Sequence, residues 1–379
     1  MMKRTYFLIV LLVSLLILAL LLNYYPFVKT PPKSGSQNLY VGVDVAYNDL
    51  AKIKSLVDEI SSYTNLLVIG STGITYNATE LTVTCQYAYD RNMSFIFYTW
   101  TPQQPSQQWL EEAKNKWGDR FLGLYIYDEV GGKQLDGYKG GTIQEANNYT
   151  DAKNQYVTTV NNYLNYVSGQ PNLMDLPIFT SDYALYWFDY EAGYDTVFAE
   201  FGWNHSRQLN VALCRGAATV QNKDWGIMIT WTYTDPPYLE SGEQLYNDMV
   251  LAYNSGAKYI IVFDSNADHT QGILQEEHLQ AMQQFWQYVK DNPRTNSPAA
   301  DRVAFVLVDD YAYGFRGPND KIWGLWEADN FTYQLCVNLN VTMQQYGSKL
   351  DVIYDDPRFP NYRNIYGTTM FWNGAVYGE

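Results

Sequence analysis

The 379-residue sequence is poor in cysteine and histidine, with three residues of each. Cys85, Cys214 and Cys336 are odd in number and widely spaced, which excludes a disulfide framework and favours buried free thiols. The sequence has no HExxH or CxxC segment, which argues against a zinc site, and no GxGxxG or GxxxxGK[ST] segment for a nucleotide phosphate. We therefore expect neither a metal nor a cofactor.

Positive charge is also scarce. Lys and Arg number 25 against 40 Asp and Glu, which gives a formal net charge of −15. Nucleic acids and anionic lipid surfaces both need a basic face, so neither is an expected partner. The sequence is instead rich in aromatic side chains, with 35 Tyr and 11 Trp. Such rings fill protein cores, and they also line clefts in which a flat ring packs on the apolar face of a sugar.

The N-terminus carries a long apolar run. Lys3 and Arg4 precede an uncharged stretch from Tyr6 to Leu22, which lies at the short end of the range that spans a bilayer. We expect a cytoplasmic stub and a transmembrane anchor over residues 1–25, then a Pro-, Ser- and Gly-rich linker over 26–38. The bulk of the chain would lie outside the cell on a single-pass membrane anchor. The alternative is a secreted protein released by signal cleavage, although no small-x-small cleavage site follows the run.

Six N-x-S/T sequons are spread over the exported region. They begin at Asn77, Asn92, Asn148, Asn204, Asn330 and Asn340. Each triplet is weak evidence alone, but their distribution is consistent with an exported glycoprotein.

From residue 39 onward, a short apolar run followed by a segment of helical period repeats eight times. The runs are 39–47, 65–71, 94–100, 121–129, 176–183, 195–203, 225–233 and 258–266. They are apolar on both sides, as in a buried parallel sheet. Eight such units in about 255 residues predict a (β/α)8 TIM barrel over 39–293, with a doubly wound open sheet as the alternative. The short link between the fifth and sixth runs predicts a reduced helix there.

A smaller unit follows a linker-like stretch at 290–302. Strand patterns at 303–311 and 350–356 flank a helical pattern at 331–347, and 367–373 can form a further strand. We expect a small C-terminal α/β domain over 294–379 that packs on the barrel.

Acidic and aromatic residues gather where the eight predicted strands end. Barrels of this kind carry their chemistry at the C-terminal ends of the strands. The acids there are Asp44, Asp128, Glu129, Asp182, Glu200 and Asp264, and the aromatic residues include Tyr98, Trp100, Trp203, Trp231 and Tyr233. Cleavage of a glycosidic bond needs one carboxylic acid to protonate the leaving oxygen and a second carboxylate as nucleophile or base. The sequence therefore favours carbohydrate as the substrate or ligand.

On these features, residues 39–293 resemble a TIM-barrel glycoside hydrolase at the level of architecture. The trailing unit is similar in placement to the domain that follows the barrel in some β-galactosidases. In the largest clan of these enzymes an acid/base Glu ends strand four, usually after Asn, and a nucleophilic Glu ends strand seven. Glu129 matches the first position, with Asp128 in place of Asn, but the seventh run has no acid. Other barrel glycosidases use acids on strands four and six, which would pair Asp128 or Glu129 with Glu200.

The working hypothesis is an exported, membrane-anchored glycoside hydrolase-like enzyme with Glu129, Glu200 and Asp128 as catalytic candidates. Glu129 would be the acid/base and Glu200 the nucleophile or base. The apolar flanks of Glu200 should raise its pKa. Carboxyl groups about 5–5.5 Å apart would predict retention of configuration, and about 6.5–9.5 Å inversion. The expected substrate-binding residues are Asp44, Tyr98, Trp100, Asp182, Trp203, Trp231, Tyr233 and Asp264.

Two other interpretations remain open. Acids at strand ends often cap the next helix or pair with a basic residue, so each one can be purely structural. The missing acid on the seventh strand also fits a non-catalytic cell-surface module that binds glycans or a partner protein through the same cleft. Such binding would need the aromatic rings but no paired carboxylates.

Overall fold

The computed structural model describes residues 39–137, 141–168, 176–294 and 298–377. Residues 39–379 form one compact unit. The predicted anchor at 1–25 and linker at 26–38 lie outside the described residues. Within the described part of the chain, every helix is too short or too polar to cross a membrane.

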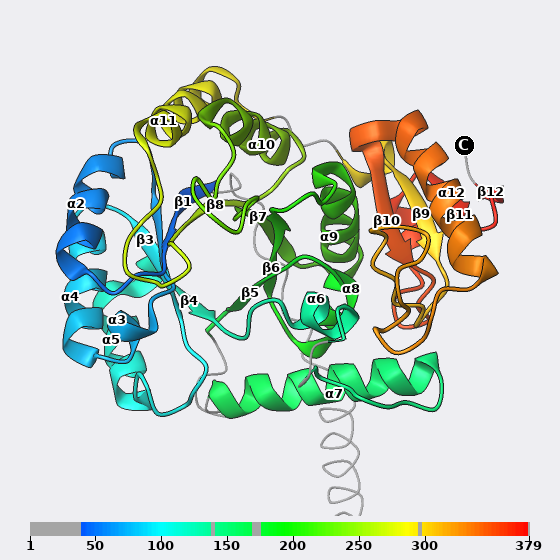
Figure 1. The fold of residues 1–379 in the computed structure, drawn as a ribbon, viewed down its shortest axis with the longest axis horizontal. Coiled ribbons are helices and arrows are strands. Elements are labelled where there is room, and N and C mark those ends of the chain that lie inside the picture. The colour runs from blue at the N-terminus through cyan, green and yellow to red at the C-terminus, as the bar shows by residue number, and fades with distance from the viewer. Residues whose placement is uncertain (1–38, 138–140, 169–175, 295–297, 378–379) are drawn as a thin grey trace, which may run out of the picture. The chain divides into compact units, whose positions relative to one another are not determined.

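Eight parallel strands close into a barrel in chain order, which confirms the predicted (β/α)8 architecture (Figure 1). The strands are β1 (Tyr40–Val45), β2 (Leu66–Ile69), β3 (Ser94–Tyr98), β4 (Phe121–Tyr125), β5 (Ile178–Asp182), β6 (Thr196–Phe201), β7 (Asp224–Ile229) and β8 (Tyr259–Asp264). The barrel closes where β1 pairs with β8, with Tyr40 opposite Tyr259. Seven of the eight strands fall within the predicted runs, and β7 begins one residue before its run, at Asp224. The agreement arises because runs that are apolar on both faces mark strands buried from both sides.

Helices surround the barrel (Figure 1). They are α2 (Leu50–Ile60), α3 (Thr72–Thr75), α4 (Ala78–Tyr89), α5 (Gln107–Trp117), α6 (Val130–Leu135), α7 (Tyr149–Val167), α8 (Tyr186–Ala192), α9 (Arg207–Gln221), α10 (Gly242–Asn254) and α11 (Glu276–Asp291), with a 3₁₀ turn η1 (Gly118–Arg120) before β4. The first of them shows the local logic. The Asp49 carboxylate caps α2 by accepting from two backbone N–H groups, and Ile53, Val57 and Ile60 bury one face. Between β5 and β6, α8 has only seven residues, as the short link predicted.

Aromatic side chains fill much of the barrel interior. Successive strand residues point to opposite faces, so every second residue faces inward. The inner cluster comprises Leu66, Val68, Ile96, Tyr125, Phe179, Phe198, Met228, Tyr259 and Ile261, and Tyr40, Tyr98, Leu122 and Phe263 pack against it. Tyr259 stacks on Tyr40 at 5.0 Å between ring centroids and meets Phe179 edge to face at 5.5 Å. This packing fills the interior of the barrel, so a ligand site can form only at the C-terminal ends of the strands.

A second, four-stranded sheet follows the barrel, in the order β10-β9-β11-β12. Its elements are η2 (Ala299–Asp301), β9 (Val303–Leu307), α12 (Asn330–Tyr346), η3 (Gly347–Lys349), β10 (Leu350–Tyr354), α13 (Tyr362–Ile365), β11 (Thr368–Phe371) and β12 (Val376–Tyr377). β10 and β11 run parallel to β9, whereas β12 is antiparallel to β11. The two strands and the helix predicted here are present, and 368–371 is the further strand.

The small sheet packs on the barrel through α8 and α9, which lie beside β10 in Figure 1. Trp187 of α8 packs on the Tyr354 ring at 5.4 Å between centroids. A Cβ atom added at Gly216 of α9 would lie 2.4 Å from the Val352 carbonyl oxygen, so glycine permits the close approach of α9 to β10. In the same junction, Arg215 of α9 reaches the buried Asp351 carboxylate at 2.6 Å.

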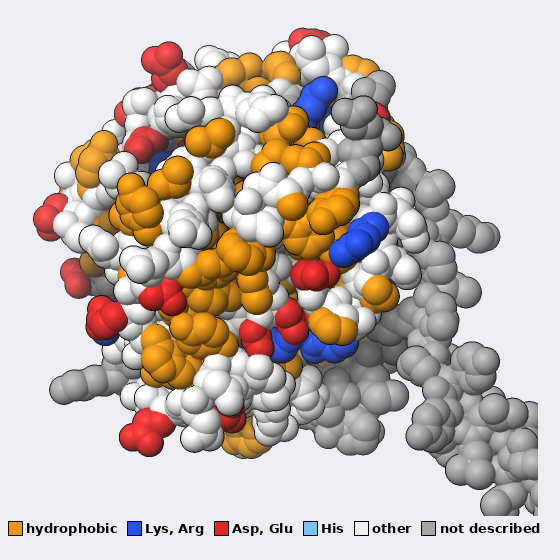
Figure 2. All heavy atoms as spheres, turned by 90° about the vertical axis from the view of Figure 1, so that its right-hand side faces the viewer, with side chains coloured by type: hydrophobic (Ala, Val, Ile, Leu, Met, Phe, Trp, Pro, Cys, Tyr) orange, Lys and Arg blue, Asp and Glu red, His pale blue; other side chains and the backbone are white. Residues whose placement is uncertain are grey.

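The outer side of the small sheet presents apolar side chains to solvent (Figure 2). On α12, Tyr333, Val337 and Val341 are exposed at helical spacings of four residues and share one face.

The three cysteines differ in burial. Cys85 and Cys214 are buried, as expected, but Cys336 on α12 is partly exposed, which corrects the prediction for that residue.

Candidate active site at the barrel mouth

The acids at the strand tips do not all face the same way. Asp44 on β1 and Glu200 on β6 share the two-residue period of the inner cluster and point into the barrel. Asp182 and Asp264 occupy the alternate positions on β5 and β8, which face the surrounding helices and loops. Asp128 and Glu129 lie just beyond β4. The structure therefore separates four acids at the mouth from two acids directed outward.

Glu200 is held by a short chain of hydroxyl groups. The Ser181 hydroxyl donates to Glu200 Oε1 at 2.7 Å, and the Tyr125 hydroxyl lies 2.7 Å from Ser181 Oγ. Because Ser181 gives its single proton to Glu200, Tyr125 is the donor to Ser181. The other carboxyl oxygen, Glu200 Oε2, is buried and has no hydrogen-bond partner among the described residues. The Ser181 hydroxyl, itself held by Tyr125, thus bonds to Oε1, which leaves Oε2 as the oxygen available to a ligand.

The surroundings of Glu200 favour its protonated form. Its side chain is only 4% exposed. Burial raises the pKa of Glu200 well above its ordinary value, and the nearby charge of Glu129 raises it further, against a smaller lowering by the Ser181 hydrogen bond. The raised pKa expected from the apolar flanks of Glu200 is therefore present. A carboxyl group that keeps its proton near neutral pH has the property required of a general acid.

Asp44 is the second inward-facing acid. Its side chain is 2% exposed, and its Oδ1 atom has no hydrogen-bond partner in the part of the chain that the structure describes. Burial raises the pKa of Asp44 well above its ordinary value, and the charge of Asp128 adds to this effect, against a smaller lowering by the backbone of Gly70. A Cβ atom at Gly70 would lie 2.4 Å from Asp44 Oδ1, so only glycine leaves space for the carboxyl group there.

The tip of β4 adopts an uncommon backbone conformation. Tyr127 and Glu129 both have left-handed φ values, 54° and 55°, although neither is glycine. They flank Asp128 and aim its side chain toward the Tyr98 hydroxyl, which donates to Asp128 Oδ1 at 3.4 Å. The Glu129 N–H donates to the Ser181 carbonyl at 2.8 Å and ties this tip to β5. Left-handed residues of this kind cost free energy and concentrate at functional sites.

Lys133 lies against the two acids of the β4 tip. Its Nζ atom is 3.1 Å from Glu129 Oε2 and 3.9 Å from Asp128 Oδ2. Burial raises the pKa of Glu129, the charge of Asp128 raises it further, and Lys133 opposes both effects. Glu129 and Glu200 repel each other when both are ionised, and the cation sits beside Glu129. Of the two carboxyl groups, Glu200 is therefore the one that retains a proton.

The carboxylates of Asp182 and Asp264 accept hydrogen bonds from backbone N–H groups of nearby loops and helices. The Asp182 carboxylate accepts from the N–H groups of Gly131 and Gly132 at 2.6 and 2.8 Å, which anchors the first turn of α6. Burial raises the pKa of Asp182 to about 7, and these backbone hydrogen bonds oppose that effect. The Asp264 carboxylate accepts from the N–H groups of Ile273 and Leu274 at 2.5 and 3.0 Å. Their contact with substrate stays a prediction, and their observed role is to position loops.

The aromatic residues predicted to hold a ligand form two groups. Tyr98 faces the barrel interior and meets the Tyr125 ring at 5.4 Å, next to Asp128. Trp100 lies farther out, 55% exposed, and stacks on Tyr76 at 6.4 Å with 23° between the rings. Tyr98 is thus a half-buried ring beside an acid and Trp100 an exposed ring, and their contact with a sugar stays a prediction.

The other group lies beyond β6 and β7. Trp203 and Tyr233 are 36% and 48% exposed, and they line an open depression of about 610 Å³ with the loop 232–237. Trp231 is half-buried, and its indole N–H donates to the Ser265 carbonyl at 2.9 Å, which holds the ring in place. The Trp203 N–H in turn donates to the Trp231 carbonyl at 2.8 Å. The two exposed rings can contact a ligand, whereas Trp231 supports them.

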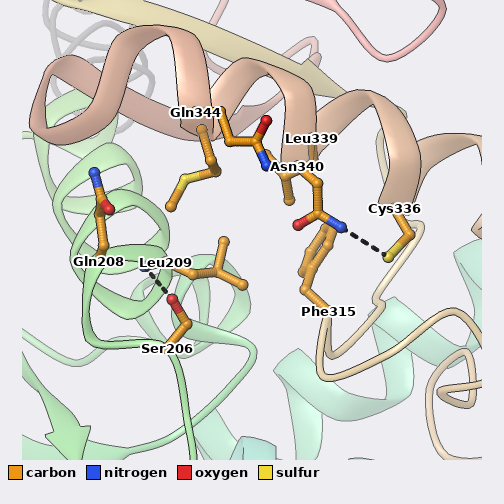
Figure 3. A pocket seen from close by; sticks show the side chains of 9 residues that line it. Ser206, Gln208, Leu209, Phe315, Cys336, Leu339, Asn340 and Gln344 are labelled. Atoms are coloured by element: carbon orange, nitrogen blue, oxygen red, sulfur yellow. Dashed lines mark hydrogen bonds between the residues drawn. The ribbon is translucent and has the colours of Figure 1, made fainter.

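A separate cavity of about 280 Å³ lies between the start of α9 and α12 (Figure 3). Leu209 faces the cavity from α9, and Phe315 faces it from the loop before α12. Cys336, Leu339 and Asn340 face it from α12. None of the residues that line it is acidic or basic. It therefore lacks the groups for acid–base chemistry, and the barrel mouth is the stronger candidate site.

Sequence reasoning missed three residues of the mouth: Tyr125, Ser181 and Lys133. Ser181 precedes the acid Asp182, and Tyr125 lies inside an apolar run, so neither stands out by type. The signal that could identify them is the two-residue alternation: Tyr125 and Ser181 share the inward face with Phe179 and Phe198. Lys133 lies four residues after Glu129 on α6, which is ion-pair spacing on a helix.

No family model and no curated protein matches the sequence. Among solved structures, the chain is similar to the endo-β-1,4-mannanase from Thermotoga petrophila, with a TM-score of 0.45 and 9% identity over 72% of this chain and 82% of that one. It is also similar to the β-mannanase from the blue mussel Mytilus edulis, with a TM-score of 0.44 and 9% identity over 67% and 92% of the two chains. A truncated 3-deoxy-D-arabino-heptulosonate 7-phosphate synthase from Thermotoga maritima matches at 0.36, with 10% identity over 70% and 92%. The expected resemblance to TIM-barrel glycoside hydrolases is present among these structures, and an enzyme of other chemistry is similar too.

Proposed function

We propose that this chain is a glycoside hydrolase-like enzyme whose two principal carboxyl groups are Glu200 and Glu129. The observation that carries the proposal is the state of Glu200: a buried carboxyl group with one oxygen held by Ser181 and the other free on the inner face of the barrel. Glu129 lies at the tip of β4, two strands from β6 in the barrel, and its charge acts on Glu200 more strongly than that of any other acid. Two carboxyl groups with different protonation states are the requirement of glycosidic cleavage.

In this proposal Glu200 donates its Oε2 proton to the departing glycosidic oxygen as the bond to the sugar carbon breaks. Glu129, kept anionic by Lys133, either bonds to that carbon or takes a proton from the attacking water. Asp128 supports the site through its charge and its hydrogen bond from Tyr98. These roles exchange those expected from the sequence, where Glu129 is the acid/base, because Glu200 is the more deeply buried group.

The direct test is hydrolysis of a panel of end-labelled oligosaccharides of different sugars and linkages, with products resolved by chromatography. The unmodified protein should cleave at least one member, and Glu200→Gln and Glu129→Gln should each abolish cleavage. Glu191→Gln is the matched control, because Glu191 is also a buried glutamate but lies at the junction with the small sheet. NMR of the first product then gives retention or inversion. Equal turnover by all three variants would refute the assignment.

A non-catalytic glycan-binding module is the second candidate. It is favoured by the exposed rings of Trp100, Trp203 and Tyr233 and by the lack of an acid on β7 beyond its first residue. A glycan array separates the two functions. Binding that survives Glu129→Gln, with no turnover by the unmodified protein, would favour the module.

We also propose that the protein is exported and held at the membrane by its N-terminal segment, with the barrel outside the cytoplasm. The motivation is the apolar run from Tyr6 to Leu22 behind Lys3 and Arg4. All six sequon asparagines are exposed, which is consistent with glycosylation outside the cytoplasm. N-terminal sequencing of the membrane fraction tests this. An intact N-terminus released only by detergent supports the anchor, whereas a mature chain that begins near residue 25–35 means a secreted protein.

A further inference from the structure

Among the described residues, the acids of the barrel mouth outnumber the basic side chains that contact them. Asp44, Asp128, Glu129 and Glu200 act on one another there: Asp128 influences Asp44, Glu129 and Glu200, and Glu129 influences Glu200. The cation in contact with this group, Lys133, reaches Glu129 and Asp128. Neither Asp44 nor Glu200 forms an ion pair within the described residues.

Two buried carboxyl oxygens in this group lack a hydrogen-bond donor among the described residues. Asp44 Oδ1 and Glu200 Oε2 are without a hydrogen bond, although their side chains are 98% and 96% buried by the exposures given above. A buried polar atom without a partner costs free energy, so native proteins rarely retain one without a use for it. Both atoms belong to inward-facing residues of the barrel, on β1 and β6. A ligand that enters the mouth is the natural partner for both.

The chemistry of that ligand follows from what the mouth offers. Among the described residues, no three acidic, His or Cys side chains are arranged to hold a metal ion. A hydroxyl group could bond to one oxygen but would leave the repulsion among the carboxylates unchanged. An ammonium group supplies three hydrogen-bond donors and a positive charge. The rings of Tyr98 and Tyr125, beside Asp128 and Ser181, add faces that attract an organic cation.

We propose that the deepest part of the site binds a sugar unit with a free, protonated amine, and that Asp44 is the residue that recognises the amine. This deepens the proposed function and rests on it. Asp44 would accept from the ammonium through Oδ1, and Asp128 would contribute charge from the β4 tip. Glu200 remains the donor to the glycosidic oxygen. The substrate class is therefore an oligosaccharide of amino sugars that are not N-acetylated.

The test compares the binding of three probes by calorimetry: a glucosamine tetramer, an N-acetylglucosamine tetramer and a glucose tetramer with the same β-1,4 linkage. The measurement is made at a pH at which the amines are protonated, with Glu129→Gln as the background if the unmodified protein cleaves a probe. We expect the glucosamine tetramer to bind at least tenfold more tightly than either neutral probe. This preference should shrink as salt is raised, because it depends on charge.

Asp44→Asn keeps the shape of the side chain and removes its charge. It should erase most of the preference for the glucosamine tetramer and leave the affinity for neutral probes within about threefold. The matched control is Asp268→Asn, an exposed acid in the loop after β8. It removes the same unit of charge from the same end of the barrel and should leave the preference intact. An equal loss in both variants would show a general charge effect and overturn the assignment to Asp44.

The outcomes also separate this inference from the proposed function. Equal or tighter binding of the neutral probes by the unmodified protein would overturn the amine assignment while leaving glycoside hydrolysis intact. If no oligosaccharide of the hydrolysis panel or of this trio is bound or cleaved, the proposed function fails and this inference fails with it. If Asp44→Asn does not fold, the comparison of the three probes on the unmodified protein still decides the question.

Discussion

Asp44 at the barrel mouth and Asp351 at the junction with the small sheet are both buried aspartates, yet their surroundings are opposite. Asp351 has Arg215 at 2.6 Å, Arg302 at 2.7 Å and a hydrogen bond from the Tyr366 hydroxyl at 2.7 Å. Asp44 has an oxygen with no partner and another acid, Asp128, as its main charged neighbour. A buried acid whose bonds are complete serves the fold, whereas one left incomplete is available for a ligand.

The largest expected effect is on catalysis at the mouth. Glu200→Gln should lower kcat/KM about 10²–10⁴-fold, because the amide cannot donate a proton to the leaving oxygen. In the unmodified enzyme, activity should fall as pH rises through the raised pKa of Glu200, since the proton is then lost. The measurement is a pH profile of kcat/KM for both proteins. A Glu200→Gln variant with ordinary activity and the same alkaline decline would contradict the role given to Glu200.

The largest effect on stability should arise at the junction. Asp351→Asn leaves the buried Arg215 and the partly buried Arg302 without their shared counter-charge, and breaking such a buried group typically costs about 3–5 kcal/mol. Urea unfolding followed by circular dichroism measures this loss. Asp224→Asn is the comparison, because Asp224 forms an exposed ion pair with Lys258 and should change stability by less than about 1 kcal/mol. Similar losses in both variants would mean that burial does not determine how much an ion pair contributes to the free energy of unfolding.

A third effect concerns pH and Glu191 at the same junction. Burial raises the pKa of Glu191 to about 7, although Arg358 opposes the shift, and Glu191 shares a hydrogen bond with Asp356. The folded protein therefore holds a proton that the unfolded chain, with an ordinary Glu pKa of about 4.3, releases earlier. This stabilising contribution is complete below about pH 4 and is lost as pH rises to about 7, with a magnitude of about 1–3 kcal/mol.

Glu191→Gln should remove that part of the pH dependence, because the amide does not titrate. Thermal unfolding at intervals between pH 4 and pH 8 gives the two curves. Parallel curves for the variant and the unmodified protein would show that Glu191 does not carry the proton.

The smallest expected effect is the change in stability of Asp44→Asn, and it distinguishes Asp44 from Asp351 by its sign. Asp44→Asn removes an acid that must either be ionised without a counter-charge or keep a proton, so we expect an unchanged or slightly raised stability, by about 1 kcal/mol. The loss at Asp351 would have the opposite sign. Denaturant midpoints of the two variants in one buffer make the comparison, and a large loss at Asp44 would show that its carboxyl group serves the fold after all.

The architecture could be predicted from the sequence because burial on both faces leaves a strong pattern in each strand. The runs that overlap β1 to β8 are mostly apolar, and the short link before β6 predicted a reduced helix, which the seven residues of α8 confirm. The mouth was harder to predict, since the direction of a side chain depends on register. Asp182 was predicted to bind substrate, but its neighbour Ser181 is the residue that faces inward and holds Glu200.

Other features of the barrel mouth cannot be predicted from the amino-acid types at these positions. The pairing of β3 with β4 shifts register between Phe95 and Ile96, which changes the alternation that a reader would count along β4. The left-handed backbone at Tyr127 and Glu129 also cannot be anticipated, because neither residue type favours it. Acids and aromatics near the strand tips could thus be named from the sequence, but their partners and directions could not.

The shortness of α8 has a consequence for how the barrel is built. A helix of seven residues covers little of the barrel wall between β5 and β6, and Trp187 and Phe188 of this helix pack instead on Tyr354 of β10. The small sheet thus supplies the outer layer that a full-length helix would provide elsewhere around the ring. Removing the chain after residue 293 would uncover these rings together with Arg215, so the smallest portion suited to separate study runs from residue 39 through β12.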